Sequence, residues 1–376
     1  MRNGTMTAIV SPQIDRTYLL ETLAGLLEIP SPTGMTDAAV QFVCKQLDSL
    51  DIPFKLTRRG AIRADIRGVQ YSPDRAIVAH LDTLGAMVKG IRSNGRLEVV
   101  PIGTWSARFA EGARGTVFAA TDRRVRGTFL PLKASGHVFN EEVDTQPISW
   151  TNLEFRLDER VSDAADVAGV GVEIGDTIAV DPQPEFNDNG FINARHLDDK
   201  AGVAAVLAAA KAIRDAGITL LLDCHLLFTI SEEVGVGASH VLHGDVAELV
   251  SIDNGTIAPG QNTCEYGVTI AMQDSSGPFD WHLTRSLIDL CRKHGIPFSR
   301  DVFRWYRSDA AAALEAGNDI RTALLCFALD SSHGYERTHV ESVEALARLL
   351  ALYMQRPPLF ARDAAPMGPA GDLPTG

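Results

Sequence analysis

Residues 196–235 read HLDDKAGVAAVLAAAKAIRDAGITLLLDCHLLFTISEEVG, and this stretch indicates the fold. Its alanine-rich part, Leu197–Ala216, predicts a helix, and the apolar run Leu220–Ile230 that follows predicts a buried strand. A pair of aspartates opens the helix, and a pair of glutamates follows the strand. A helix joined to a mostly apolar strand is typical of an α/β protein, because helices cover both faces of a parallel sheet.

The same alternation of helix and strand extends to both sides of this stretch. Before it, the apolar spacing predicts helices over residues 14–28 and Thr36–Leu50, and strands within residues 61–80 that are separated by a turn at Ser72–Arg75. After it, the pattern predicts strands within Val246–Asp253 and over Thr322–Leu329, and helices over Leu283–His294 and Ser308–Ala316. We therefore expect an α/β fold with a mainly parallel central sheet that is flanked by helices.

Residues 84–185 have a different pattern. Short alternating runs are broken by glycines, and no long helical spacing occurs, which predicts a β-rich module. We expect a discontinuous α/β domain made of residues 1–83 and 186–361, interrupted by an inserted β-rich domain at residues 84–185. Residues 362–376 are rich in proline, glycine and alanine and predict a disordered tail.

The composition excludes several classes of protein. The formal net charge of −13 argues against a nucleic-acid partner and against docking on anionic lipid. The five cysteines are an odd number without a C-x-x-C pair, which favours a reducing compartment. No apolar signal region follows the N-terminus, and the most apolar stretch, Ala201–Ala210, is too short to span a bilayer. We expect a cytoplasmic protein without a membrane partner.

Five segments place side chains that can bind metals at the end of a predicted strand or in the turn after it. These segments are Ala79–Asp82, His196–Lys200, Ser231–Gly235, Ser251–Asn254 and Ser332–Glu336. In open α/β sheets, sites form outside the carboxyl ends of the strands, so the five can converge. Imidazole and carboxylate together suit zinc, cobalt or manganese. Two such cations need a bridging anion, and a further acid that stays off the metals can act as general base.

Each segment alone also has a purely structural explanation. A strand-end H-x-D can be a turn or a cap, and an aspartate pair before an alanine-rich helix can be an N-cap. A glutamate pair is commonly solvated, and a single histidine near a helix start commonly lies at the surface. The combination of all five segments in this order favours a metal site over these explanations.

Three of these motifs resemble those of the glutamyl and tetrahedral (TET-type) metallo-aminopeptidases. They are Ala79–Asp82, Leu197–Gly202 and Ser231–Gly235, and the resemblance extends from about Leu19 to Leu350. It implies a cytosolic hydrolase that cleaves peptide bonds with two co-catalytic metal ions, zinc, cobalt or manganese, and removes residues from the amino end of short peptides. It also implies that the β-rich insert acts in dimerisation or as a lid, and that homo-oligomers form, either dimers or a larger particle.

The resemblance further implies a role for each matching residue. The metal ligands would be His80, Asp198, Glu233, Asp253 and His333, with Asp198 as the bridge between the two ions. Glu232 would be the general base that activates the water, and Asp82 would orient the imidazole of His80. Arg307, Asp309 and His339 are candidates for the substrate side of the site. His339 is also an alternative to His333 as the last ligand, although the strand at residues 323–329 leads into His333 with the family's spacing.

Three departures from the family pattern fall around the expected substrate pocket. The family usually has glutamate where Thr83 stands, a Gly-Gly-Thr-Asp turn in place of Tyr306–Asp309, and an Arg-Tyr pair in place of Asp330–Ser332. The run from Ser331 to His339 resembles a branch linked with the N-acetylglutaminylglutamine amide osmolyte system. The sequence therefore leaves two substrate classes open: free short peptides, or a capped dipeptide cleaved by a deacylase or amidohydrolase.

Overall fold

Parallel strands form the centre of the larger part of the molecule. In the described part of the chain, residues 9–120 and 123–373, four such strands lie in the order β12-β3-β13-β17. They are β12 (Leu220–Thr229), β3 (Gly68–His80), β13 (Val246–Ile257) and β17 (Arg321–Asp330). In this computed structural model the central residues of these strands are buried, which explains their nearly continuous apolar sequence. Residues 1–8, at the start of the stretch expected to lack a signal, lie outside the described part.

Both edges of this sheet are antiparallel. One edge consists of β2 (Ile62–Ile66) and β1 (Phe54–Leu56), and the other of β18 (Glu336–His339), β11 (Phe191–Ala194) and β10 (Glu185–Phe186). A branch from β17 contains β14 (Val268–Asp274), β15 (Gly277–Pro278) and β16 (Phe298–Val302). The predicted α/β class is confirmed, and the parallel arrangement is found at the centre of a mixed sheet.

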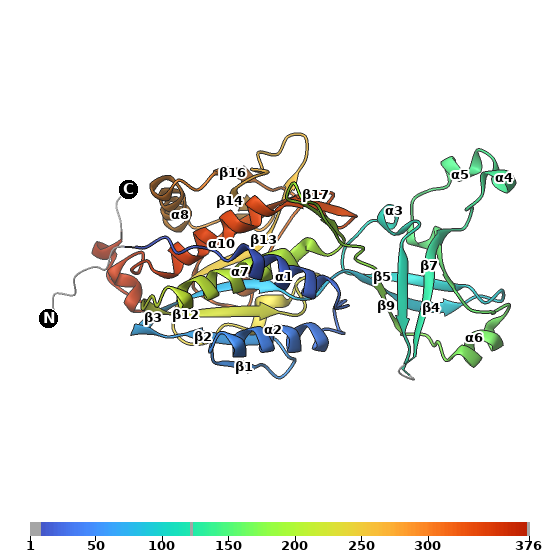
Figure 1. The fold of residues 1–376 in the computed structure, drawn as a ribbon, viewed down its shortest axis with the longest axis horizontal. Coiled ribbons are helices and arrows are strands. Elements are labelled where there is room, and N and C mark those ends of the chain that lie inside the picture. Colours follow the sequence, from blue (N-terminus) through green and yellow to red (C-terminus); the bar gives the residue numbers. More distant parts are fainter. Residues whose placement is uncertain (1–8, 121–122, 374–376) are drawn as a thin grey trace.

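Helices cover this sheet (Figure 1). The helix α7 (Leu197–Asp215) lies against β3 and β13, and its alanine side chains are almost completely buried. Against α7 pack α1 (Arg16–Leu27) and α10 (Val340–Met354). The remaining helices of the body are α2 (Asp37–Ser49), α8 (Trp281–His294), α9 (Asp309–Glu315) and the short 3-10 turn η2 (Gly237–His240). The small alanine side chains of α7 allow the surrounding helices and strands to approach closely.

A closed β-barrel projects from one end of the sheet (Figure 1). Its strands within the described part of residues 85–180 are β4 (Gly85–Ile91), β5 (Leu97–Ile102), β8 (Leu153–Leu157), β7 (Arg124–Pro131), β6 (Arg114–Phe118) and β9 (Thr177–Val180). The loops carry α3 (Ala107–Ala110), α4 (Gly136–Phe139), α5 (Glu142–Thr145), η1 (Trp150–Asn152) and α6 (Ala164–Val170). The barrel has its own apolar core, which includes Val117, Phe129 and Phe155.

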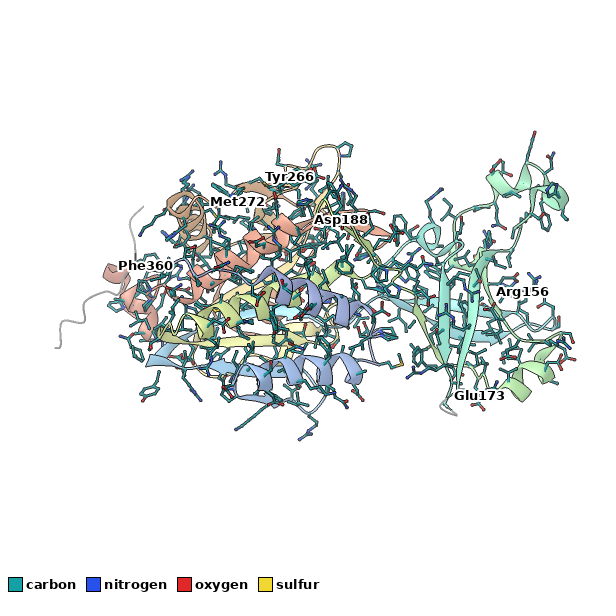
Figure 2. The ribbon with its side chains drawn as sticks, viewed as in Figure 1. Arg156, Glu173, Asp188, Tyr266, Met272 and Phe360 are labelled. Carbon is teal, nitrogen blue, oxygen red and sulfur yellow. The ribbon has the colours of Figure 1, made fainter. Side chains whose placement is uncertain are left out.

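Figure 2 shows the side chains of the barrel and of the larger body. Arg156 and Glu173 lie on the barrel, whereas Tyr266, Met272 and Phe360 lie on the larger body. The β-rich character expected for the inserted segment agrees with the barrel. We retain residues 84–185 as the proposed boundaries of an inserted domain, because β3 ends at His80 and β10 begins at Glu185, and both strands belong to the larger sheet.

Where the sequence predicts a turn at Ser72–Arg75, the structure has an irregularity within β3: Gln70 and Arg75 pair with Leu222 and Cys224, so residues 71–74 bulge out of the regular pairing with β12. Proline next to serine and aspartate is typical of turns and bulges, and regular pairing with β12 resumes at Arg75. Arg75 is completely buried and donates hydrogen bonds to the main-chain carbonyls of Tyr353 and Pro357. Its guanidinium also lies 3.8 Å from the carboxylate of Glu248. This arginine therefore fastens the end of α10 to the central sheet.

Part of the C-terminal segment expected to be disordered contains short turns. These are η3 (Ala361–Ala364) and η4 (Ala370–Asp372), and residues 374–376 lie outside the described part. Asp363 accepts hydrogen bonds at 2.8 and 3.1 Å from Arg321, which anchors the beginning of the segment to β17. None of the helices in the described residues has both the length and the apolar character that a bilayer span needs.

We predict that Arg75→Leu destabilises the protein strongly, because it leaves the buried Glu248 carboxylate without its cation. The expected loss is about 3 kcal/mol or more in the free energy of unfolding, measured by urea denaturation. Arg16→Leu is the matched control, since Arg16 forms a surface ion pair with Glu344 whose loss should cost about 1 kcal/mol or less. Equal effects of the two substitutions would contradict the anchoring role of Arg75.

Candidate active site

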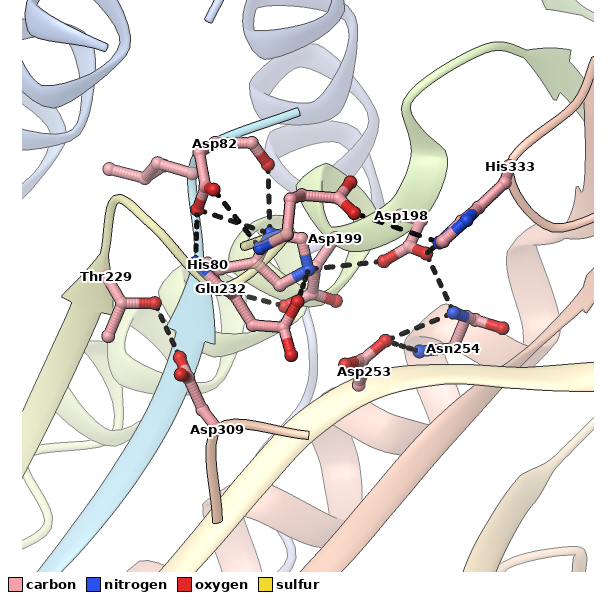
Figure 3. Close-up of polar contacts among 12 residues, drawn as sticks. His80, Asp82, Asp198, Asp199, Thr229, Glu232, Asp253, Asn254, Asp309 and His333 are labelled. Carbon is pink, nitrogen blue, oxygen red and sulfur yellow. Dashed lines mark hydrogen bonds and ion pairs between the residues drawn. The ribbon is translucent and has the colours of Figure 1, made fainter. Parts of the chain in front are cut away.

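The ends of the central strands bring the predicted site residues together. His80 is the last residue of β3, Glu232 and Glu233 follow β12, and Asp253 lies in β13. The parallel strands end at one edge of the sheet, where catalytic sites of open α/β sheets form. Asp198 comes to the same edge at the start of α7, and His333 comes in the loop after β17 (Figure 3). Their convergence therefore follows from the topology.

The carboxylate of Asp198 lies between two histidines. Its Oδ1 atom is 3.2 Å from Nε2 of His80, and its Oδ2 atom is 3.4 Å from Nε2 of His333. On the first side, donor atoms of His80, Asp198 and Asp253 all lie within 4.8 Å of one another. On the second side, Nε2 of His333 is 3.8 Å from Oε2 of Glu233. Two groups of potential ligands thus share the single carboxylate of Asp198.

Both histidines are held in the orientation that a metal ligand requires. Nδ1 of His80 is 2.9 Å from the main-chain oxygen of Asp82, and Nδ1 of His333 is 2.7 Å from that of Thr104. A carbonyl oxygen can only accept a hydrogen bond, so each Nδ1 carries the proton. Nε2 of each ring faces the shared carboxylate, and it is the nitrogen that a cation would bind in place of a proton.

Burial makes the charges of this cluster costly. It raises the pKa of Glu233 to about 8, with a further contribution from the nearby Asp198, and it raises the pKa of Asp253 and Glu232 well above their usual range. Burial opposes protonation of His333, but the neighbouring Asp198 and Glu233 outweigh it and raise the pKa of that imidazole to about 10. A divalent cation would offset this excess of buried carboxylates, and imidazole with carboxylate is a suitable donor set.

Asp82 supports the glutamate pair through its side chain. Its carboxylate accepts hydrogen bonds from the main-chain N–H groups of Glu232 at 3.0 Å and Glu233 at 3.3 Å. The same carboxylate accepts a hydrogen bond of 2.7 Å from Thr33 Oγ1. Its Oδ1 atom is 3.7 Å from Nδ1 of His80, so that imidazole is oriented by the Asp82 main chain. Asp82 thus contacts the imidazole of His80 through its main chain, as its predicted orienting role requires, while its carboxylate holds the turn after β12.

Glu232 borders the cluster without lying between the two histidines. Its Oε2 atom is 4.0 Å from Nε2 of His80, and its side chain is 12% exposed. It also lines an open cavity of about 950 Å³ together with Glu233, Asp253 and His333. Glu232 is thus a carboxylate in contact with the cavity, beside the shared carboxylate of Asp198.

The cavity is enclosed by both parts of the molecule. Gly103 and Thr104 contribute from the barrel, and residues 303–307 and Ser332 contribute from the larger body. Two of the three departures from the family pattern therefore border this space. Thr83, the third, is buried and is bonded through its main chain to Ser31 and Thr33.

The structure places the three candidates for the substrate side differently. Arg307 lines the cavity and donates a hydrogen bond of 2.7 Å to Glu315. Asp309 is buried and accepts hydrogen bonds from Thr229 Oγ1 at 2.5 Å and from the main-chain N–H of Ala238 at 2.7 Å. Burial raises the pKa of Asp309 to about 6. Asp309 thus braces the end of β12 instead of facing a substrate.

His339 lies outside the cluster that His333 joins. Its Nε2 is 3.0 Å from the main-chain oxygen of Asn189, and its Nδ1 accepts a hydrogen bond of 3.2 Å from the N–H of Glu341. It is the N-cap of α10, and its ring packs edge-on against Phe191 and Tyr266. Both ring nitrogens of His339 are therefore occupied by hydrogen bonds to the main chain. The geometry favours His333 as the last candidate metal ligand.

Several supporting residues were missed by the sequence reasoning. Asn254 donates hydrogen bonds from Nδ2 to Asp198 at 2.8 Å and to Asp253 at 3.1 Å. Glu336 accepts hydrogen bonds from the main-chain N–H groups of Asp198 at 3.2 Å and His333 at 2.9 Å. Asn254 ends the segment Ser251–Asn254, and Glu336 ends the segment Ser332–Glu336. Their place in these segments was the only signal in the sequence that pointed to them.

Asp199 holds the main chain of His80 in place. Its Oδ2 atom accepts a hydrogen bond of 3.2 Å from the main-chain N–H of His80. A Cβ atom at Gly202 would lie 2.0 Å from Oδ1 of Asp199, so only glycine fits at that position of α7. The motif that begins at Asp198 therefore contains the candidate bridging ligand Asp198, the residue Asp199 that supports the candidate ligand His80, and the glycine that makes room for Asp199.

Comparison with known proteins identifies the family of the chain. The family model described as M42 glutamyl aminopeptidase matches residues 60–349. The protein YhfE of Bacillus subtilis strain 168, an aminopeptidase by provisional name, is 36% identical over 338 residues. That alignment covers 90% of this chain and 97% of the relative.

Solved structures of archaeal peptidases share the fold. A TET aminopeptidase from Thaumarchaeota archaeon SCGC AB-539-E09 matches with a TM-score of 0.83 and 18% identity, over 92% of this chain and 98% of its own. The TET1 peptidase of Pyrococcus horikoshii, which can assemble into a tetrahedron or a large octahedral shell, matches with a TM-score of 0.78 and 21% identity, over 89% and 99%. The family match extends over most of the sequence and includes every proposed ligand. The chain therefore belongs to the M42 glutamyl aminopeptidase family and is a hydrolase of peptide bonds.

Proposed function

We propose that this metal-dependent peptidase is an aminopeptidase that holds two divalent cations on either side of Asp198. The position of the Asp198 carboxylate, with one oxygen 3.2 Å from His80 and the other 3.4 Å from His333, is the observation that carries the proposal. His80 and Asp253 would hold one cation, and Glu233 and His333 the other. Zinc, cobalt and manganese all suit these ligands.

The proposed chemistry divides between the cations and Glu232. The bound cations would supply Lewis acidity for the scissile carbonyl and lower the pKa of a water molecule. Glu232 borders the cavity and lies outside the shared ligand set, so it is placed to accept the proton of the attacking water. The same carboxyl group then donates that proton to the departing amine. Asp82 fixes the backbone of Glu232 and so holds its carboxylate in reach of the reaction.

The charge of the cavity supports a free peptide as the substrate. Glu232 lines this cavity and is assigned to neither cation, so its carboxylate would attract a free α-amino group. Arg304 and Arg307 line the same cavity and could contact the substrate carboxylate or its amides. A capped dipeptide lacks the positive amine, and the relatives above are named as aminopeptidases, provisionally in the case of YhfE.

We also propose a cytoplasmic homo-oligomer. The free cysteines in the described structure are consistent with a reducing compartment. The barrel projects from the body and leaves its outer surface available for contact with other copies (Figure 1). Large assemblies formed by a peptidase of the same fold support this proposal.

Glu232→Gln should lower kcat for a dipeptide by about 100-fold or more, because it removes the general base while keeping the side-chain shape. Bound metal, measured by mass spectrometry after dialysis, should remain at the level of the unaltered protein. Glu344→Gln, the same change at the surface, is the control and should leave kcat unchanged. A Glu232→Gln enzyme within a few-fold of full activity would exclude Glu232 as the base.

His333→Ala should lower the metal content by about one equivalent per chain, because it removes one ligand of the proposed second cation. His339→Ala is the matched control and should retain all of the metal, since both ring nitrogens of His339 are engaged elsewhere. The reverse result would assign the last ligand to His339.

The choice of substrate is tested with free dipeptides and with their N-acetylated forms. We expect the zinc-, cobalt- or manganese-loaded protein to release the first residue of free dipeptides. It should cleave the N-acetylated dipeptides at least about 100-fold more slowly, because acetylation removes the charge of the amine. Glu232→Gln serves as the blank. Faster cleavage of the acetylated forms would establish the deacylase that the pocket departures left open.

A further inference from the structure

A second group of histidines and carboxylates lies in the sheet, away from the cavity. Asp65 of β2 and His225 of β12 are directly opposite each other across the antiparallel pair. Asp74 lies on the neighbouring β3, and His243 lies in the loop between η2 and β13. His225 precedes Thr229, at the active-site end of β12, by roughly 13 Å along the strand. The group is therefore separate from the Asp198 cluster.

Three donor atoms of this group converge. Nδ1 of His225 is 2.7 Å from Oδ1 of Asp65, and Nε2 of His243 is 2.8 Å from the same oxygen. All three donor atoms lie within 4.8 Å of one another, and the two imidazole rings are 4.1 Å apart between centroids. Two imidazoles and one carboxylate are a common donor set for zinc.

The carboxylate of Asp74 contacts the second ring nitrogen of His225. Nε2 of His225 is 3.2 Å from Oδ2 of Asp74, which also accepts a hydrogen bond of 2.8 Å from the N–H of Asp245. A carboxylate on the second nitrogen of a histidine orients metal-binding imidazoles in many proteins. Asp74 is 5% exposed, and its Oδ1 atom has no hydrogen-bond partner among the residues that the structure describes.

The loop is closely fitted to the group. Gly244 has a φ of +71°, and a Cβ atom at this position would lie 2.3 Å from Oδ2 of Asp74 and 2.9 Å from Nε2 of His225. Glycine is therefore required for the loop to bring its backbone and the neighbouring His243 against the sheet. The arrangement therefore depends on Gly244, because glycine adopts this positive φ readily and has no Cβ atom to collide with Asp74 or His225.

The negative charge of the two carboxylates in this group can be balanced by a cation or by added protons. Asp65 and Asp74 contribute two negative charges, and neutral imidazoles do not offset them. Arg67 Nη2 lies 3.9 Å from Oδ2 of Asp65, but this guanidinium donates its hydrogen bond to Asp223. Either protonation of both histidines or one divalent cation would balance the two carboxylates.

We propose that Asp65, His225 and His243 form a separate binding site for one divalent transition-metal ion of the zinc class, with Asp74 orienting His225. Ligand atoms around tetrahedral zinc are about 3.4 Å apart, so the Asp65 oxygen would have to move about 0.6 Å from each nitrogen. The side chains of Asp65 and His243 are 23% and 24% exposed, which gives the ion a path from solvent. The ion would fasten the loop before β13 to β2 and β12.

The test compares zinc content after dialysis at micromolar free zinc, measured by mass spectrometry. His243→Ala should bind about one equivalent less per chain than the unaltered protein. His240→Ala is the matched control, because this exposed histidine at the end of η2 lies three residues before His243 and outside the group, and it should bind the full amount. Dipeptide hydrolysis should be unchanged in both variants, so the result is independent of the number of ions in the catalytic cluster.

Asp65→Asn provides a second variant that preserves side-chain shape. It should also lose one equivalent of zinc, with a circular dichroism spectrum like that of the unaltered protein. If His243→Ala fails to fold, the zinc content of Asp65→Asn decides the question. Full zinc content in a folded Asp65→Asn or His243→Ala protein would overturn the proposal and identify the group as a protonated hydrogen-bond network.

Discussion

The carboxylate of Asp198 faces His80 with one oxygen and His333 with the other, and much of the fold serves to maintain this arrangement. Burying so many carboxylates at one point is costly, because each loses its hydration. The surrounding chain limits their freedom through hydrogen bonds from Asn254 to the carboxylate and from the Asp198 main chain to Glu336. A shared anion held this rigidly is suited to lie between two cations.

The barrel contributes to this arrangement as well as to the overall shape. The carbonyl of Thr104 fixes the ring of His333, although the barrel and the central sheet have separate apolar cores. Gly103 and Thr104 also form part of the cavity wall. The barrel is thus part of the active-site framework, and its position relative to the sheet affects the orientation of a proposed ligand.

The sequence predicted those features that depend on local pattern and on topology. The apolar strands and the acids at their ends sufficed to place His80, Asp198, Glu233 and Asp253 at one edge of the sheet. The turn predicted at Ser72–Arg75 is a bulge within one continuous strand, because the strand resumes its pairing at Arg75, whose other partners are distant in sequence. Asn254 and Glu336 could not be assigned roles, since their contacts depend on side-chain directions that spacing does not specify. The cis peptide bond between Asp198 and Asp199 likewise has no signal in the sequence.

The most direct test of the central claim is anomalous diffraction from crystals loaded with zinc or cobalt. The shared position of Asp198 predicts two peaks about 3.5–4 Å apart, one beside each oxygen of its carboxylate. One peak should lie near Nε2 of His80 and the other near Nε2 of His333. A single peak in the cluster, or two peaks that do not both contact Asp198, would contradict the bridging role.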